Sequence, residues 1–309
     1  MSSETAAMTT RVKQFFGLSR MTHSVLDIAH PALGALLALG AIPTARTVVI
    51  GFLAAFAGFT AVFALNDVMD CRVDCEKMTA LGKGRECFDL DSVGQRHPLA
   101  QGSMPFRAAL GWVIAWGALA IGLAFALSPL CALLMAAAAL LEVCYCLLLR
   151  ITHWKAALSG TMVTVGGLAG VYAVTSLPPW TTVLAFCVWA FAWEVGCRNI
   201  PNDWSDLEED TQLGIRTIPV RFGRRTASVI SFALMVIVLA AGVAFPAAAQ
   251  MRHPLLYAAG ALVTGVFLLF LPALRWLKAQ SMKTALAFFN AACFYPLAVF
   301  GVLGVVTLV

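Results

Sequence analysis

The chain has 309 residues, of which 61% are hydrophobic and only 12% are charged. Soluble domains carry about a quarter charged residues, and the mean hydropathy of this chain is +0.85. The net charge of +5 is not concentrated in a dense basic tract, which argues against a nucleic-acid-binding protein. The nine cysteines are an odd number, and five lie in apolar runs, unlike those of a secreted disulfide scaffold. The composition predicts an all-α, polytopic membrane protein.

The predicted elements are membrane-spanning helices. Each crossing needs about 20 apolar residues, because backbone polar groups cannot be left unpaired in hydrocarbon. Nine stretches meet this requirement, and Pro, Gly or Ser marks the short turns between them. The predicted spans are 24–42, 47–65, 108–126, 130–149, 156–177, 181–197, 226–249, 254–274 and 284–309. We expect them to form one domain, residues 1–309, with the nine helices arranged around a central cavity.

The basic residues predict the orientation of these spans. All of them except Arg46 and Arg252 fall in segments on the same side of the predicted membrane. By the positive-inside rule this side is cytoplasmic, so the N-terminus is expected inside and the C-terminus outside. No cleavable signal is expected before the first span, only a polar, partly basic tail. We predict an integral protein of the inner (cytoplasmic) membrane, with two long cytoplasmic cap loops at about 66–107 and 198–225.

Most of the acidic residues lie in these two loops, in a pattern that occurs twice. The pattern N-D-x-x-D-x-x-x-D follows the second span and again the sixth. Its residues are Asn66, Asp67, Asp70 and Asp74 in the first copy, and Asn202, Asp203, Asp206 and Asp210 in the second. On a helix, positions i, i+3 and i+7 share one face. Each copy is therefore expected to present three carboxylates as a stripe at the boundary between membrane and cytoplasm.

Carboxylates this close repel one another unless cations lie between them. Hard oxygen ligands in this number suit Mg²⁺, which often bridges carboxylates to substrate phosphates. Two facing stripes would hold two or three Mg²⁺ ions around one diphosphate and stabilise its departure. We predict that all six aspartates ligate the metal and act in catalysis. Asn66 and Asn202 are expected to complete the ligation or to donate hydrogen bonds.

A diphosphate also needs cations from the protein. The candidates on the predicted inner face are Lys83, Arg85, Arg96, Arg150, Lys155, Arg198 and Arg216. We expect Lys83, Arg96 and Arg198 to hold the phosphates, with Arg150 as a further contact to the substrate. Each of these residues alone is more often a marker of the positive-inside rule than a ligand.

Ionisable and aromatic groups inside the spans are further candidates. Three acids fall within the predicted spans, namely Asp27, Glu142 and Glu194. Such groups usually face a cavity or a charged partner. Glu194 could orient a polar acceptor, or it could form a structural pair with Arg198 or Lys155. Aromatic rings in the spans are candidates for stabilising a cationic intermediate, since ring faces attract cations.

Three further segments carry a resemblance to a known family. Arg96-His97-Pro98-Leu99-Ala100-Gln101-Gly102 resembles an R-P-L-x-x-G signature, the segment Tyr145 to His153 resembles Y-x-x-x-K-R-x-T-H, and Gly214-Ile215-Arg216-Thr217 resembles G-I-K/R-T. Together with the two acidic motifs, they resemble the UbiA superfamily of intramembrane prenyltransferases over nearly the whole chain.

The resemblance implies Mg²⁺-dependent ionisation of a polyprenyl diphosphate and transfer of the prenyl group to an acceptor, often an aromatic ring. Asn66, Asp67, Asp70 and Asp74 match the first metal-binding motif of the family, Asp206 and Asp210 match the core of the second, and Asp203 matches an extra acid found in part of it. Because Tyr145 belongs to a matched segment, it is the aromatic residue that we expect to face the allylic cation. The chain departs from the pattern at His97, which precedes Pro98 where arginine is expected, and at Leu149, where lysine is expected.

Two other functions fit the same residues. A terpene cyclase built on this scaffold would use the same ionisation step, with an internal double bond capturing the cation and no external acceptor. A cation transporter would use the carboxylates to bind ions in transit. However, most of the acids lie on the inner face, whereas transporter sites usually lie near the middle of the membrane. The preferred interpretation is a prenyltransferase with a lipophilic acceptor that the sequence does not identify.

Overall fold

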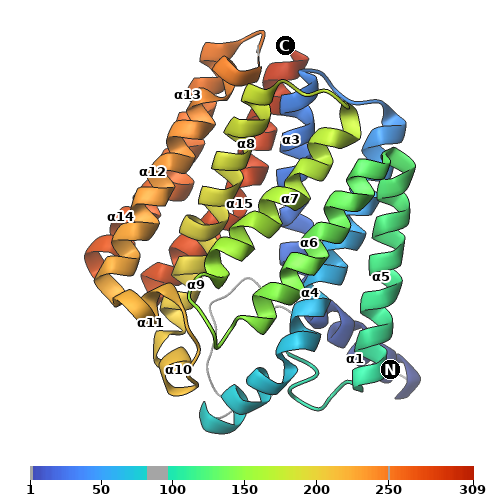
Figure 1. Ribbon diagram of the computed structural model, residues 1–309, viewed down its shortest axis with the longest axis vertical. Helices are drawn as coiled ribbons and strands as arrows, with labels where there is room; N and C mark the ends of the chain where they lie inside the picture. Colours follow the sequence, from blue (N-terminus) through green and yellow to red (C-terminus); the bar gives the residue numbers. More distant parts are fainter. Residues whose placement is uncertain (1–2, 82–96, 250) are drawn as a thin grey trace.

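The computed structural model describes residues 3–81, 97–249 and 251–309, and within these ranges it contains helices and turns but no strand (Figure 1). The predicted all-α class is therefore confirmed. The helices are α1 Ser3–Leu18, α2 Met21–Asp27, α3 Ala29–Leu39, α4 Ala45–Leu81, α5 Phe106–Leu127, α6 Pro129–Leu147, α7 Lys155–Val174, α8 Trp180–Ala192, η2 Trp193–Asn199, α9 Ile200–Ser205, α10 Leu207–Gln212, α11 Ile218–Phe222, α12 Arg224–Ala249, α13 Pro254–Gly265, η3 Val266–Phe270, α14 Leu271–Ala279 and α15 Met282–Leu308.

Eight helical stretches in the described part of the chain are long and apolar enough to cross a membrane. They correspond to the second to ninth predicted spans, so the protein is an integral membrane protein. The predicted first span, 24–42, is divided into α2 and α3. Pro31 lacks the N–H group that would bond to the carbonyl oxygen of Asp27 in a continuous helix. Nδ1 of His30 lies 3.2 Å from that oxygen instead. The count of nine spans stays a prediction.

Close packing of α3 against α7 depends on glycines of α7. A Cβ atom at Gly170 would overlap the backbone carbonyl of Pro31 in α3, and one at Gly167 would lie 2.6 Å from Nε2 of His30. Both distances are shorter than real Cβ contacts. Small residues are typical of closely packed helices in membranes, where packing contacts are a main source of association energy.

Both segments predicted as cap loops are largely helical where the structure describes them. α4 has 37 residues and continues past the predicted span to Leu81, and no Gly or Pro interrupts the sequence between Gly58 and Leu81. The second segment contains α9, α10 and α11. In Figure 1 these three helices and the far end of α4 lie at the lower end of the bundle, opposite the C-terminus. The two acidic motifs are thus carried to the same end.

A π-helix, η2, connects α8 to α9. It ends two residues before Pro201, which cannot donate a backbone hydrogen bond to the preceding turn. π-helical turns occur frequently at functional sites. Here η2 leads directly into the helix that carries Asn202 and Asp203.

The packing of α3 on α7 gives a test of the fold. We expect Gly170→Ala to destabilise the protein by about 1–3 kcal/mol, as overpacking typically does. Gly166→Ala is the matched control, because a Cβ atom there meets nothing within 4 Å. Thermal unfolding in detergent should show a lower midpoint for Gly170→Ala and an unchanged or slightly higher one for Gly166→Ala. Equal midpoints would contradict the observed packing.

Candidate active site

The first acidic stripe lies on one face of α4 and is contacted by cations from elsewhere in the chain. Asp67 is buried, with 3% of its surface exposed. Nδ1 of His97 lies 2.9 Å from Oδ2 of Asp74 and 3.3 Å from Oδ1 of Asp67. Nη2 of Arg20 lies 3.7 Å from the same Oδ1 of Asp67. Two basic side chains therefore face this stripe, one from a segment before α4 in the sequence and one from a segment after it.

Asn66 is held at one end of the first stripe by an acid within the bundle. Its Nδ2 donates a 2.8 Å hydrogen bond to Oε1 of Glu142 in α6 and lies 3.5 Å from Oδ2 of Asp70. Its Oδ1 accepts a 3.1 Å hydrogen bond from Arg20. These contacts fix the orientation of the amide. The buried Glu142 thus positions Asn66, a residue predicted to take part in metal binding.

The negative charge of the second stripe is also partly neutralised by two lysines. Nζ of Lys155, the first residue of α7, lies 3.4 Å from Oδ1 of Asp203. Nζ of Lys77 lies 3.4 Å from Oδ1 of Asp210. Because Lys77 belongs to α4, this ion pair joins the helix of the first stripe to the second stripe. Asp206, at the turn between α9 and α10, accepts a 3.2 Å hydrogen bond from Ser205.

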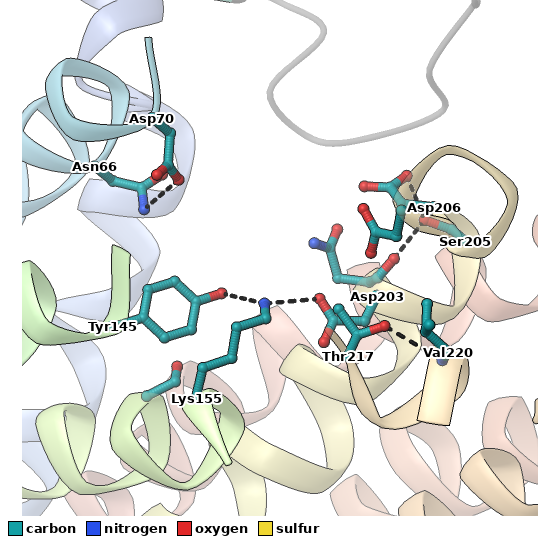
Figure 2. Close-up of polar contacts among 12 residues, drawn as sticks. Asn66, Asp70, Tyr145, Lys155, Asp203, Ser205, Asp206, Thr217 and Val220 are labelled. Carbon is teal, nitrogen blue, oxygen red and sulfur yellow. Dashed lines mark hydrogen bonds and ion pairs between the residues drawn. The ribbon is translucent and has the colours of Figure 1, made fainter. Parts of the chain in front are cut away.

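The two stripes face each other across a space that is also bordered by residues of α6 and α7. Figure 2 shows Asn66 and Asp70 on one side, Asp203 and Asp206 on the other, and the side chains of Tyr145 and Lys155 reaching in between. Nζ of Lys155 donates a 3.1 Å hydrogen bond to the Tyr145 hydroxyl. The geometry therefore brings both predicted acidic motifs to one site.

The donor atoms of this site fit a divalent cation. Oδ2 of Asp67 and Oδ2 of Asp203 are buried and have no hydrogen-bond partner among the described residues. Buried anionic oxygens without a partner are costly. Ligand atoms of Asp67, Asp74 and His97 also lie within 4.8 Å of one another. A hard divalent ion bound by the carboxylates would satisfy these oxygens.

The central acid of each stripe differs from the outer ones. Within the described residues, Asp70 and Asp206 form no ion pair with the protein, and their hydrogen bonds are to the neutral Asn66 and Ser205. The outer acids are paired with Arg20, His97, Lys77 or Lys155. Of the six carboxylates, these two are thus the ones without an ion pair in the part of the chain that the structure describes.

The close spacing of charges in the site shifts the pKa values of His97 and Asp210. Burial by itself lowers the pKa of His97, but the adjacent carboxylates of Asp67 and Asp74 outweigh it and raise the pKa to about 9. His97 is therefore a cation at neutral pH in the metal-free protein. Burial, with the charge of Asp203, raises the pKa of Asp210 to about 7 despite the nearby Lys77. Without a metal, the second stripe thus carries less than its full negative charge at neutral pH.

Other residues predicted for the site lie apart from the stripes or outside the described ranges. Nη1 of Arg198 forms ion pairs with Asp27 at 3.0 Å and with Glu194 at 3.3 Å. This is the structural pairing that the sequence left as an alternative. Arg150 forms an exposed ion pair with Glu76. The remaining predicted contacts, Lys83 and Arg96, lie outside the residues that the structure describes.

Sequence reasoning missed Arg20 and Lys77 as cations of the site. The position of Lys77 could have been predicted, because it follows Asp70 by seven positions and Asp74 by three on the same helix and therefore shares their face. The position of Arg20 could not, because its approach to Asn66 and Asp67 depends on how the N-terminal helices pack. His97 was noted only as a departure from a family signature.

An apolar cavity of about 150 Å³ lies next to the site, among α3 to α7. Its lining includes Val62, Ala138 and Val163. Each of these lies one helical turn from a polar residue of the bundle, namely Asn66, Glu142 and Ser159 respectively. A cavity of similar volume engineered in another protein binds benzene. The site therefore combines a polar, anionic end with a hollow suited to an apolar group.

A helical membrane bundle with facing carboxylate stripes and an adjoining apolar hollow has the features expected of an intramembrane enzyme acting on an amphipathic anion. Comparison with known proteins identifies the family. Residues 30–302 match the model of the UbiA prenyltransferase family, so the chain belongs to this family. The predicted resemblance is confirmed, and so is the predicted enzyme class, prenyltransferase, at the level of the family.

Curated relatives share between a quarter and a third of their residues with the chain where they align. A 4-hydroxybenzoate octaprenyltransferase from Hydrogenovibrio crunogenus is 30% identical over 138 residues, which cover 44% of this chain and 47% of that protein. The chain thus matches about half the length of that relative. A digeranylgeranylglyceryl phosphate synthase from Thermococcus kodakarensis is 26% identical over 235 residues, covering 73% of this chain and 76% of that protein.

Solved structures share the fold at lower identity. An apo UbiA homologue from Aeropyrum pernix K1 superposes with a TM-score of 0.71 at 19% identity, covering 93% of this chain and 98% of that one. A UbiA homologue from Archaeoglobus fulgidus bound to DMAPP and Mg²⁺ gives a TM-score of 0.69 at 20% identity, covering 94% and 99%. These similarities confirm the architecture of the helical bundle.

The donor set generates a test that does not require turnover. We expect Mg²⁺ to raise the thermal midpoint of the wild-type protein, since a ligand at 100 times its Kd stabilises the native state by about 2.7 kcal/mol. Asp206→Asn should lose most of this gain, because it removes a central ligand. Glu208→Gln is the matched control, as Glu208 is an exposed acid of α10 paired with Arg224. The same Mg²⁺-dependent shift in all three proteins would argue against a metal site at the stripes.

Proposed function

We propose that this protein is a Mg²⁺-dependent intramembrane prenyltransferase, which ionises a polyprenyl diphosphate and transfers the prenyl group to a lipophilic acceptor, for example an aromatic ring. The observation that carries the proposal is that two carboxylate stripes face each other beside an apolar cavity. A diphosphate with an isoprenoid tail needs both environments at once. Family membership supports the reaction class.

In this proposal the six aspartates hold two or three Mg²⁺ ions, and Asn66 and Asn202 complete their surroundings. The metal would stabilise the charge that develops on the departing diphosphate. The chain's own part is to place the carboxylates opposite each other. Glu142 and Arg20 keep the Asn66 amide in one orientation. With the carboxylates and the Asn66 amide fixed in this way, the site would hold the diphosphate at one position relative to the cavity.

The cavity would receive the apolar tail and exclude water from the allylic cation. Tyr145 lies in the same turn of α6 as Glu142 and faces the space between the stripes (Figure 2). Its ring presents an electron-rich surface, which attracts positive charge. We therefore assign to Tyr145 a contact with the reacting end of the prenyl group.

The names of the relatives favour transfer over cyclisation, because they include an octaprenyltransferase of 4-hydroxybenzoate. A terpene cyclase remains the second candidate, since both reactions share the ionisation step. Incubation of the purified protein with prenyl diphosphate and Mg²⁺ alone distinguishes them. A cyclic hydrocarbon formed without acceptor would favour the cyclase. Product formation only after addition of a lipophilic acceptor would favour the transferase.

We further propose that the chain forms one domain, residues 1–309, in the inner membrane, with the N-terminus and the active site on the cytoplasmic side. The distribution of Lys and Arg supports this orientation. The acidic stripes and the basic residues of the predicted inner segments then share one side. A water-soluble diphosphate product would be released directly into the cytoplasm.

The central acids provide the test of the proposed reaction. We expect Asp70→Asn and Asp206→Asn each to reduce diphosphate release from a labelled prenyl diphosphate by at least about 100-fold, because groups that stabilise developing charge contribute on this scale. The measurement uses purified protein in detergent with Mg²⁺, and Glu208→Gln serves as the control. Undiminished release from both aspartate variants would reject the assignment.

The cavity predicts a change in donor preference. Gly166 lines it, and a Cβ atom at this position meets nothing within 4 Å. Gly166→Leu should therefore fill part of the cavity without distorting α7. We expect kcat/KM for long-chain prenyl diphosphates to fall at least about tenfold, which is the loss typical when one or two apolar groups of a substrate no longer fit their pocket. For dimethylallyl diphosphate, kcat/KM should change little. An equal effect on short and long donors would show that the tail lies elsewhere.

A further inference from the structure

Lys155 is a buried ammonium group, and the sequence predicts it only as one of seven candidate cations for a diphosphate on the inner face. Only 2% of its surface is exposed, whereas lysine is almost never fully buried unless it is paired. It begins α7, and its side chain reaches toward the space between the two stripes (Figure 2). Nζ lies 3.4 Å from Oδ1 of Asp203 and 3.1 Å from the Tyr145 hydroxyl. The position of this charge requires an explanation.

The contacts of Lys155 leave part of its hydrogen-bonding capacity unused. An ammonium group has three N–H donors, and Asp203 and Tyr145 are its two hydrogen-bond partners among the described residues. On the other side of the pair, Oδ2 of Asp203 is buried and has no partner in the described part of the chain. A donor and an acceptor are therefore both available where the stripes face each other.

A purely structural ion pair does not account well for this arrangement. Burying two opposite charges costs about as much desolvation energy as their attraction returns, so apolar replacements are often no less stable. Among the described residues, Lys77 also faces the second stripe, but it comes from α4 and pairs with Asp210. Val163, two turns further along α7 from Lys155, lines the apolar cavity. Lys155 therefore lies at the end of α7 that faces the stripes, with the cavity further along the same helix.

We propose that Lys155 is a substrate-binding residue, whose ammonium group donates to the diphosphate at the end nearest the prenyl group. This inference rests on the proposed function, because its ligand is the diphosphate of the prenyl donor. When the bond between the prenyl carbon and the bridging oxygen breaks, the electron pair stays on that oxygen. The fixed positive charge of Lys155 stabilises this oxygen without transferring a proton, and Asp203 keeps the ammonium group charged and in place.

The test separates diphosphate binding from simple neutralisation of Asp203. The probe is inorganic diphosphate with Mg²⁺, whose affinity is measured by calorimetry for the wild type, Lys155→Met, Asp203→Asn and the double variant. Lys155→Met leaves Asp203 unpaired, but the double variant removes both charges and so remains a fair test if the single variant folds poorly. Lys278→Met, at an exposed position of α14, controls for the loss of one positive charge.

We expect Lys155→Met to weaken diphosphate binding about tenfold or more, the loss typical of one charge-assisted hydrogen bond. The double variant should also bind diphosphate more weakly than Asp203→Asn does. Lys155→Arg, which keeps the charge, should retain most of the affinity, and kcat should follow the same order. If the double variant binds diphosphate as tightly as Asp203→Asn, Lys155 serves only to neutralise Asp203 and the inference is wrong.

Failure of this inference is distinguishable from failure of the proposed function. A wild-type protein that binds no diphosphate in the presence of Mg²⁺ would overturn the proposed function itself. Wild-type binding and turnover that are lost in Asp206→Asn but unaffected in Lys155→Met would overturn the role of Lys155 alone.

Discussion

The mutual repulsion of six carboxylates at one end of the bundle is the constraint on which the site depends. Like charges at this spacing are tolerated only when cations lie among them. The protein supplies some of these from other elements: Arg20 and His97 face the first stripe, and Lys77 and Lys155 face the second. Among the described residues the compensation is incomplete, because the central acids have no ion pair there and buried oxygens of Asp67 and Asp203 have no hydrogen-bond partner. Uncompensated carboxylates of this kind are the ligands that divalent cations such as Mg²⁺ prefer.

Two helices deliver these stripes in different ways. α4 runs without interruption past the apolar segment, so the first stripe keeps the regular spacing of an α-helix. The second is divided, because the helix turns at Asp206 between α9 and α10. The π-helix η2 and Pro201 precede this turn within the same helical stretch. One rigid and one bent element can therefore converge on a common space, with Lys77 and Asp210 joining them at the far end.

The sequence predicted the acidic stripes because their spacing is local: positions i, i+3 and i+7 define a helical face whatever surrounds it. It also predicted where eight spanning helices begin to within two residues from apolar length alone, although α4 continues well past the predicted end of its span. It did not predict which cations meet the stripes, because Arg20 approaches Asn66 across 46 residues of sequence and Lys155 approaches Asp203 across 48. The family pattern directs attention to Leu149 and Arg150, whereas the buried charge of this segment belongs to Lys155, at the start of the next helix. The contact of Arg150 with the substrate stays a prediction. The division of the first span was missed because Asp27, His30 and Pro31 lie inside a run of otherwise mostly apolar residues.

The charges buried in the bundle fall into two groups with different consequences. In the first group, Arg198 forms ion pairs with Asp27 and Glu194, and Ser159 donates a 2.7 Å hydrogen bond to Glu194. This group links α2, α7 and η2 directly before the second stripe. Like the pair of Lys155 and Asp203, it leaves buried polar atoms without a hydrogen-bond partner among the described residues, such as Oδ1 of Asp27 and Nε of Arg198. The two groups therefore differ in position rather than in how completely their polar atoms are paired. Arg198 is enclosed by two carboxylates within the bundle, whereas Lys155 reaches toward the space between the two stripes (Figure 2).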